Sequence, residues 1–181
     1  MYESMSSFVS PENVRMHTEY LKDLKFKYSI LEKSEPKIKG ACARDIIKMR
    51  ILKDIKREAV ALKSEIELHK CYFNSFSLTS TALKSFMPCY SSDADFRYRI
   101  FCTAMELGSG FVYITVSPHA YPEIRRYTDV SVDAVYDPLF ALDVSEHAYF
   151  YDWGFAKREY LKKAISALDL GRINIILDNK R

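Results

Sequence analysis

The stretch Asp143-Val144-Ser145-Glu146-His147-Ala148-Tyr149 brings two carboxylates and an imidazole close together in the chain. Asp143 and His147 are four residues apart, and Glu146 lies directly before the histidine. A carboxylate oxygen and an imidazole nitrogen at this spacing can supply half of a mixed coordination shell for a transition metal. The stretch therefore predicts half of a metal site, and the remaining ligands must come from elsewhere in the chain.

Two amphipathic helices are predicted in the N-terminal part of the sequence. Ser10 is a candidate N-cap with a proline after it, and helical spacing of apolar residues continues until near Pro36. A second helix, from about 43 to 76, has few breakers and should return antiparallel to the first. His17 and His69 lie on the apolar stripes of these helices, so both are expected to be buried. The stripe of the second helix consists of Ile47, Ile51, Ile55, Leu62, Ile66, His69 and Phe73.

The C-terminal half has a different pattern. Turn-rich segments at 77–80 and 88–95 predict a boundary between two domains, at 1–88 and 89–181. The elements expected after it are a helix at 95–107, strands at 111–116, 126–132 and 139–144, and a helix at 153–168. The predicted fold class is α+β: an N-terminal antiparallel helical hairpin, followed by an α/β domain with a three-stranded antiparallel sheet flanked by helices.

Composition narrows the possible functions. The chain has 181 residues, 48% of them hydrophobic, which is enough for a sizeable core. No apolar run approaches the roughly 20 residues needed to span a bilayer, and the N-terminus lacks the layout of a secretory signal, so a cytoplasmic protein without membrane association is expected. The net charge of +3 is too small to imply a nucleic-acid partner. The lysines of the first helix are interpreted as a solvated face, or as a source of attraction for a small anion.

The cysteines argue against two kinds of site. They lack the spacing of a zinc motif or a disulfide framework, and are expected to be buried thiols: Cys42, Cys71, Cys89 and Cys102. A single histidine on an apolar helix face is usually a hydrogen-bonded core residue. The joint occurrence of His17, His69, Asp143 and His147 changes this interpretation, because three imidazoles and one carboxylate form a ligand set suited to iron or manganese.

Four segments resemble the iron/manganese superoxide dismutases and occur in that family's order. They are Ser10-Pro11-Glu12-Asn13-Val14-Arg15-Met16-His17, Glu67-Leu68-His69-Lys70-Cys71-Tyr72-Phe73-Asn74, Gly108-Ser109-Gly110-Phe111-Val112-Tyr113 and the stretch from Asp143 to Tyr149. The resemblance implies that His17, His69, Asp143 and His147 bind one iron or manganese ion per subunit and that superoxide is the substrate. It also implies a homodimer in which Glu146 pairs with the ligand histidine of a partner subunit.

The chain departs from the family around this site. Glu65 stands at the position of one lineage's outer glutamine, and Val132 at that of the other lineage's glutamine. An ionised glutamate cannot donate a hydrogen bond, and its charge should favour the more oxidised ion. An ungapped alignment puts Lys25 at the gate tyrosine, while Tyr20, one turn after the first histidine, is an alternative. Phe150 replaces an interface tyrosine, and Ser145 in the stretch quoted above replaces a tryptophan.

Three functions are therefore compared. The first is an active superoxide dismutase in which Tyr20, Glu65 and Glu146 assist the metal site. The second is a metal-binding, superoxide-dismutase-like protein with little dismutase activity and a structural or interaction role, which the altered surroundings favour. The third, a basic helical module that binds nucleic acid, lacks the aromatic and arginine residues suited to bases.

Overall fold

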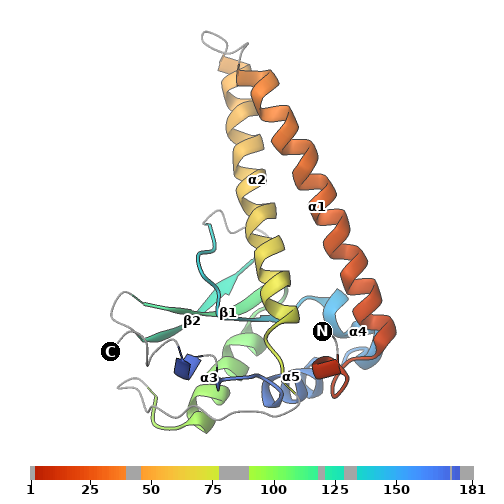
Figure 1. The fold of residues 1–181 in the computed structure, drawn as a ribbon, viewed down its shortest axis with the longest axis vertical. Coiled ribbons are helices and arrows are strands. Elements are labelled where there is room, and N and C mark those ends of the chain that lie inside the picture. The colour runs from red at the N-terminus through yellow and green to blue at the C-terminus, as the bar shows by residue number, and fades with distance from the viewer. Residues whose placement is uncertain are drawn as a thin grey trace.

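The computed structural model of the chain describes residues 3–39, 46–77, 90–117, 121–128, 134–171 and 173–175. A short 3-10 helix at Glu3–Met5 precedes two long helices, α1 (Pro11–Lys39) and α2 (Ile46–Phe73). The remaining elements are α3 (Asp93–Glu106), β1 (Phe111–Val116), β2 (Pro122–Tyr127), β3 (Phe140–Asp143), α4 (Glu146–Trp153) and α5 (Lys157–Ser166). The predicted α+β class is confirmed: a helical hairpin precedes a three-stranded antiparallel sheet with helices (Figure 1). The predicted domain boundary at 88/89 falls among residues outside the described ranges and stays a prediction.

The start of α1 follows the predicted capping chemistry. The backbone N–H of Asn13 donates to the Ser10 hydroxyl at 3.2 Å, so this side chain satisfies one of the free donors of the first turn. The predicted end near Pro36 is three residues too early, since α1 continues to Lys39. A proline beyond the first turn removes one backbone hydrogen bond and crowds the preceding turn, which can kink a helix without ending it.

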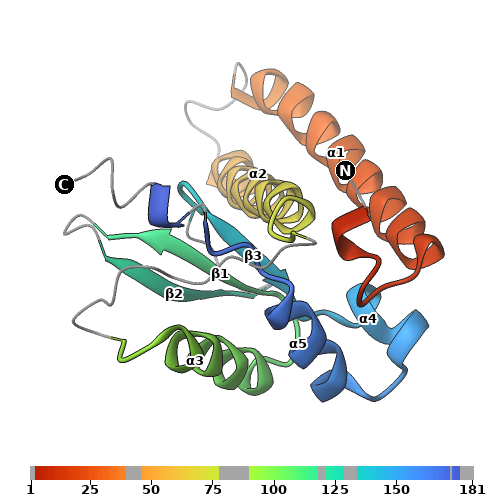
Figure 2. The same ribbon diagram turned by 60° about the horizontal axis from the view of Figure 1, so that its bottom comes forward.

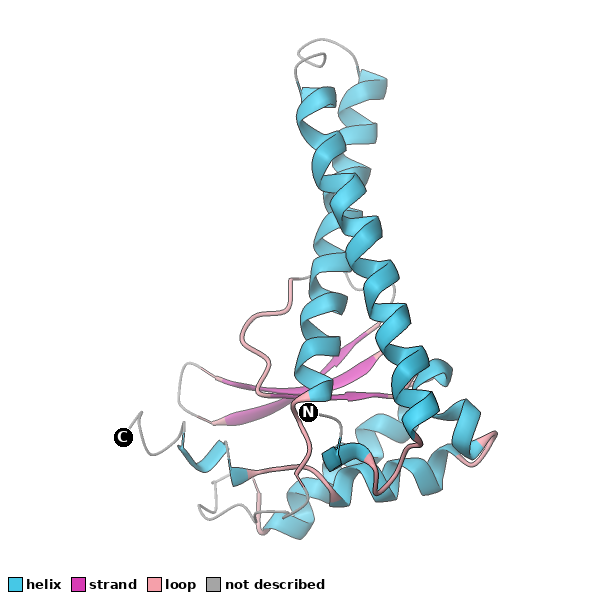
Figure 3. Cartoon of the chain, turned by 45° about the vertical axis from the view of Figure 1, so that its right-hand side comes forward, coloured by secondary structure: helices cyan, strands magenta, loops and turns pink. Residues whose placement is uncertain are grey.

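The apolar stripe predicted for α2 is wrong at its outer end. Ile66 and Phe73 are buried, whereas Ile47 is 72% exposed and Ile51 is 45% exposed. The reason is visible in Figures 1 and 3, where the outer turns of the hairpin extend beyond the sheet. The sheet therefore covers only the inner turns of α2, and these are the turns that carry His69.

The sheet has the order β2-β1-β3, with β1 pairing antiparallel to both neighbours. The predictions for β1 and β3 are confirmed to within a residue at each end. The second strand was predicted at 126–132 but lies at Pro122–Tyr127. The antiparallel pairing with β1 fixes these bounds: Pro122 pairs with Val116 at one end of β2, and Tyr127 pairs with Phe111 at the other. The connection between the two strands is short, so β2 begins soon after β1 ends. A proline is tolerated there because β2 is an edge strand.

The helix predicted at 153–168 is shorter than expected, since α5 runs from Lys157 to Ser166. A further helix that was not predicted, α4 (Glu146–Trp153), precedes it. Gly154 separates the two helices with a φ of +52°, a backbone conformation that glycine adopts readily. His147 lies in the first turn of α4, shortly after strand β3 ends at Asp143.

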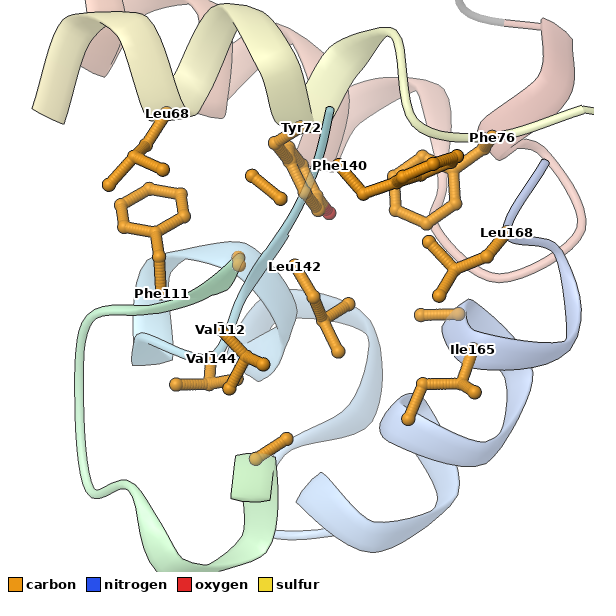
Figure 4. Close-up of a cluster of buried hydrophobic side chains, with 14 of the residues drawn as sticks. Leu68, Tyr72, Phe76, Phe111, Val112, Phe140, Leu142, Val144, Ile165 and Leu168 are labelled. Carbon is orange, nitrogen blue, oxygen red and sulfur yellow. The ribbon is translucent and has the colours of Figure 1, made fainter. Parts of the chain in front are cut away.

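The main core lies between α2, the sheet and α5. Figure 4 shows Leu68, Tyr72 and Phe76 from α2 and the segment after it, facing Phe111, Phe140 and Leu142 of the sheet and Ile165 and Leu168 near α5. All eight residues are buried. In Figure 2, α2 lies on one face of the sheet while α3 and α5 lie on the other. This packing holds the inner end of α2 over the end of β3, where Asp143 is located.

Some sequence predictions concern residues that are outside the described ranges: Cys42, Cys89 and Val132. Cys71 and Cys102, which were expected to be buried, are only partly buried. None of the described helices is long and apolar enough to cross a membrane.

Candidate metal centre

Four side chains from four elements converge on one point. His17 comes from α1, His69 from α2, Asp143 from the end of β3 and His147 from the first turn of α4. One ligand atom from each residue lies within 4.8 Å of the corresponding atoms of the other three. Segments separated by more than 100 positions in the sequence therefore meet at the junction of the hairpin and the sheet.

The carboxylate of Asp143 is central to this cluster. Its Oδ2 atom lies 3.2 Å from His17 Nε2, 3.6 Å from His69 Nε2 and 2.9 Å from His147 Nε2. The His69 and His147 Nε2 atoms are 3.4 Å apart. Donor atoms that each bind the same ion at about 2.1 Å can be at most about 4.2 Å apart, so these four separations suit a shared ion.

Backbone hydrogen bonds orient two of these ligands. His69 Nδ1 donates to the carbonyl oxygen of Glu65 at 2.8 Å, which leaves Nε2 directed at the cluster. Asp143 Oδ1 accepts the backbone N–H of Ser145 at 2.8 Å, which leaves Oδ2 for the cluster. Metal-binding histidines and carboxylates are typically oriented in this way, by a hydrogen bond from a neighbouring group to the side-chain atom that does not face the ion.

Two buried atoms in the cluster lack a hydrogen bond. Among the described residues, His17 Nε2 and Asp143 Oδ2 are buried polar atoms without a hydrogen-bond partner. An unsatisfied buried polar atom costs about 1–3 kcal/mol, and more when it is charged. A cation bound between them would satisfy both atoms, and three imidazole nitrogens with one carboxylate oxygen suit iron or manganese. The residues present therefore fit the metal that the sequence predicts.

The protonation states of the cluster also favour a cation. Burial lowers the pKa of His17, and it lowers the pKa of His69 to about 4. Burial alone would raise the pKa of Asp143, but the neighbouring His147 and His17 side chains hold it well below its ordinary range. Near pH 7 His17 and His69 are therefore neutral and the Asp143 carboxylate is ionised, which is the state that binds metals.

The lowered pKa of His69 predicts how the stability of the metal-free protein depends on pH. Between the ordinary histidine pKa of about 6.5 and its folded value of about 4, the unfolded chain binds more protons at His69 than the folded chain does. The free energy of unfolding should therefore fall as the pH is lowered through this window, by on the order of 3 kcal/mol. Urea unfolding of metal-free protein between pH 7 and pH 4 measures this change. The control is His69→Gln, whose slope should be shallower; equal slopes would contradict the prediction.

Comparison with known protein families identifies a family whose sequences match this chain. A sequence profile of the C-terminal domain of iron/manganese superoxide dismutases matches residues 80–174, just over half of the chain. The chain belongs to the iron/manganese superoxide dismutase family. A search of curated proteins gave no match to this chain. The matched range contains Asp143 and His147, while His17 and His69 lie before it, so the convergence of all four residues is a separate observation from the family match.

Tyr20 and Lys25, the two candidates for the gate position of this dismutase family, lie differently with respect to the four-residue cluster. The hydroxyl of Tyr20 donates to Glu65 Oε1 at 2.9 Å, and the Tyr20 ring lies 4.4 Å from the ring of His147 and 5.4 Å from that of His69, between ring centres. Lys25 is exposed. Of the two candidates, Tyr20 therefore lies beside the cluster of His17, His69, Asp143 and His147, and Glu65 accepts the hydrogen bond of its hydroxyl.

A pocket of about 350 Å³ leads from the surface to the cluster. It is lined by Met16, His17, Glu146, His147, Phe150 and Tyr151. Glu146 is exposed at its rim rather than at the ligand atoms. The predicted role of Glu146 in a dimer therefore depends on a partner subunit and stays a prediction.

Sequence reasoning missed the contacts made by Ser145 and Asn13. The Ser145 hydroxyl, at the position of the family's tryptophan, accepts the backbone N–H of Gly110 at 3.0 Å and so ties the ligand-bearing turn to the start of β1. Asn13 is buried and donates from Nδ2 to the carbonyl of Ala148 at 3.2 Å, which joins α1 to α4. The position of Asn13, one helical turn before His17, was the available sign that its side chain faces the same interior as the histidine.

Proposed function

We propose that this family member is a superoxide dismutase in which His17, His69, Asp143 and His147 bind one iron or manganese ion per subunit. The observation that supports the proposal best is the convergence of three imidazoles and one carboxylate, with two buried atoms that lack hydrogen-bond partners among the described residues. A cation is the simplest group that satisfies these atoms together.

The protein's own residues would hold the ion and control access to it. Iron or manganese would supply the one-electron chemistry that converts superoxide to dioxygen and hydrogen peroxide. The pocket beside His17 and His147 is a route for a small anion, and exposed lysines such as Lys22 and Lys25 on α1 favour its approach. The hydrogen-bonded pair of Tyr20 and Glu65 would restrict the space next to the ligand histidines.

The direct test is elemental analysis of the purified protein, combined with a superoxide assay on iron-loaded and manganese-loaded samples. The proposal predicts about one ion per chain and turnover in at least one of the two loaded forms. Absence of bound metal would contradict the ligand set. Metal at about one per chain with negligible turnover would contradict dismutation but leave the ligand set intact.

The second candidate function is a metal-binding, superoxide-dismutase-like protein with little dismutase activity and a structural or interaction role. It is favoured by the carboxylate of Glu65, which stands where the family places an amide and accepts the Tyr20 hydrogen bond. Glu65→Gln distinguishes the two functions in the same assay. If the wild type turns over well, the first function holds. If turnover appears only in Glu65→Gln, the second describes the natural protein.

We further propose that the chain forms a homodimer through the face of α4 around Glu146. On this face and in the turn after α4, Phe150 is 46% exposed and Phe155 is 95% exposed, and their rings are in contact at 5.4 Å. Exposed aromatic side chains are typical of interface anchors. A partner here would also cover the rim of the pocket, where Glu146 lies.

Phe155→Asp is expected to weaken this dimer at least about tenfold, because loss of an aromatic anchor at an interface hot spot costs about 2 kcal/mol or more and each 1.4 kcal/mol is about tenfold. Sedimentation equilibrium measures the dissociation constant. The matched control is Tyr136→Asp, which adds the same charge at a residue that is 77% exposed, on the connection to β3. A wild type that sediments as a monomer of 21.1 kDa at all concentrations would contradict the proposal.

A further inference from the structure

Two buried tyrosines connect the hairpin to the end of β3 behind the metal cluster. The hydroxyl of Tyr160 donates to the backbone carbonyl of Asp143 at 2.9 Å. The hydroxyl of Tyr72 lies 3.2 Å from that of Tyr160. Because the proton of Tyr160 is used by the carbonyl, Tyr72 is the donor to Tyr160. The result is a chain of two hydroxyls that ends on the backbone of the carboxylate residue.

The other end of this chain is connected to both histidines of the hairpin. Tyr72 follows His69 by three residues on α2, so the two side chains lie on the same helix face. The ring of Tyr72 also packs against the ring of His17, with 5.0 Å between ring centres. Figure 4 shows Tyr72 pointing from α2 toward the sheet. The two hydroxyls therefore link α2, α5 and β3, and the ring of Tyr72 also contacts the ring of His17 on α1.

Core packing alone does not explain these hydroxyls. Both tyrosines have 0% exposure, and burial raises the pKa of each above its ordinary value, so both remain neutral. A phenylalanine would fill nearly the same volume without the cost of burying a polar group. Two hydroxyls that satisfy one another and the carbonyl of Asp143 are expected where a particular geometry has to be held.

We propose that Tyr72 and Tyr160 are positioning residues for the metal centre. Their hydroxyl chain fixes the spacing between the Asp143 carboxylate and the two histidines of the hairpin, and so slows release of the bound ion. The inference depends on the proposed ligand set. It concerns residues that touch neither the ion nor the substrate, and it goes beyond dismutation itself.

The test uses full-length protein loaded with iron, and measures the rate of metal transfer to a chelator and the electron paramagnetic resonance spectrum of the ferric form. Tyr160→Phe should release iron about tenfold faster or more, as is usual when a group that supports a ligand is removed. Its ferric spectrum should also change, because the carboxylate ligand is no longer held at the same angle. The ferric spectrum, unlike the release rate, would not respond to a loss of core stability alone, because it reports the geometry of the bound state.

The matched control is Tyr149→Phe. The ring of Tyr149 stacks on that of Tyr160 at 5.2 Å, but its hydroxyl is not part of the chain. This variant should keep the wild-type release rate and spectrum. Tyr72→Phe leaves the bond between Tyr160 and Asp143 intact, so a smaller acceleration is expected. In the double variant Tyr72→Phe/Tyr160→Phe the release rate should match that of Tyr160→Phe alone, because Tyr72 acts through Tyr160.

The outcomes separate this inference from the proposed function. A wild type that takes up no iron would overturn the ligand set. A wild type that binds iron, together with Tyr160→Phe protein of unchanged release rate and spectrum, would overturn the positioning role even if its thermal midpoint fell. If Tyr160→Phe does not fold, Tyr72→Phe decides the question, and a wild-type release rate there counts against the proposal.

Discussion

Replacing His69 with alanine is expected to lower the affinity for iron or manganese by more than about 100-fold, which exceeds the usual effect of removing a group that only supports a ligand. The side chain has 0% exposure, its Nδ1 is fixed by the carbonyl of Glu65, and its Nε2 faces Asp143 and His147. Alanine removes one of three imidazole donors and leaves a cavity that no neighbouring ligand can fill. Metal content after dialysis, measured by elemental analysis, should collapse.

The control for this substitution is Lys70→Ala on the same helix. Lys70 is exposed and forms an ion pair with Glu67 at the surface. Surface ion pairs of this kind contribute little to stability, so this variant should keep its metal. A His69→Ala protein that folds and still carries about one ion per chain would show that the cluster is not the metal site. It would also return the basic helical module to consideration.

Gly110→Ala is expected to destabilise the protein by about 3 kcal/mol or more, through backbone strain and a steric clash. Gly110 has a φ of +110°, and a Cβ atom added there would lie 2.1 Å from the carbonyl oxygen of Tyr127. The clash involves the backbone of the paired strand β2, which cannot rotate away as a side chain could. The substitution would also strain the hydrogen bond from Gly110 to the Ser145 hydroxyl, which lies between the proposed ligands Asp143 and His147 in the sequence. Urea unfolding measures the loss.

Gly108→Ala is the matched control, two residues earlier in the same turn. A Cβ atom there meets no described atom within 4 Å, and its φ is not in the left-handed region. Alanine should therefore be tolerated or slightly stabilising, since it restricts the unfolded chain. Equal stability of the two variants would contradict the close approach of β1 and β2 at Gly110.

The parts of the fold that could be predicted from sequence are those set by local chemistry. The Ser10 cap, the two long helices and strand β1 follow from capping, from periodicity and from β-branched and aromatic composition. The second strand could not be placed from its composition, because its register is fixed by pairing with β1 and by the short connection to Pro122. The exposure of Ile47 at the outer end of α2 depends on how far the sheet reaches, which helical spacing does not encode.

The candidate site shows the same division. The histidines and Asp143 could be selected because their spacing and their resemblance to a known family pointed to them. The choice of Tyr20 over Lys25 required the structure, since the hydrogen bond to Glu65 depends on how α1 is rotated against α2. The contact between Tyr72 and Tyr160 joins residues 88 positions apart, and no local pattern indicates it.

X-ray absorption at the metal edge of iron-loaded or manganese-loaded protein tests the central claim most directly. We predict a first shell of nitrogen and oxygen atoms at about 2.0–2.2 Å, with the outer-shell scattering of three imidazole rings and without sulfur. The imidazole signal should weaken by about a third in any His147→Ala protein that retains metal. A shell without imidazole scattering, or one that is unchanged by His147→Ala, would contradict the assignment of His17, His69, Asp143 and His147 as the ligands.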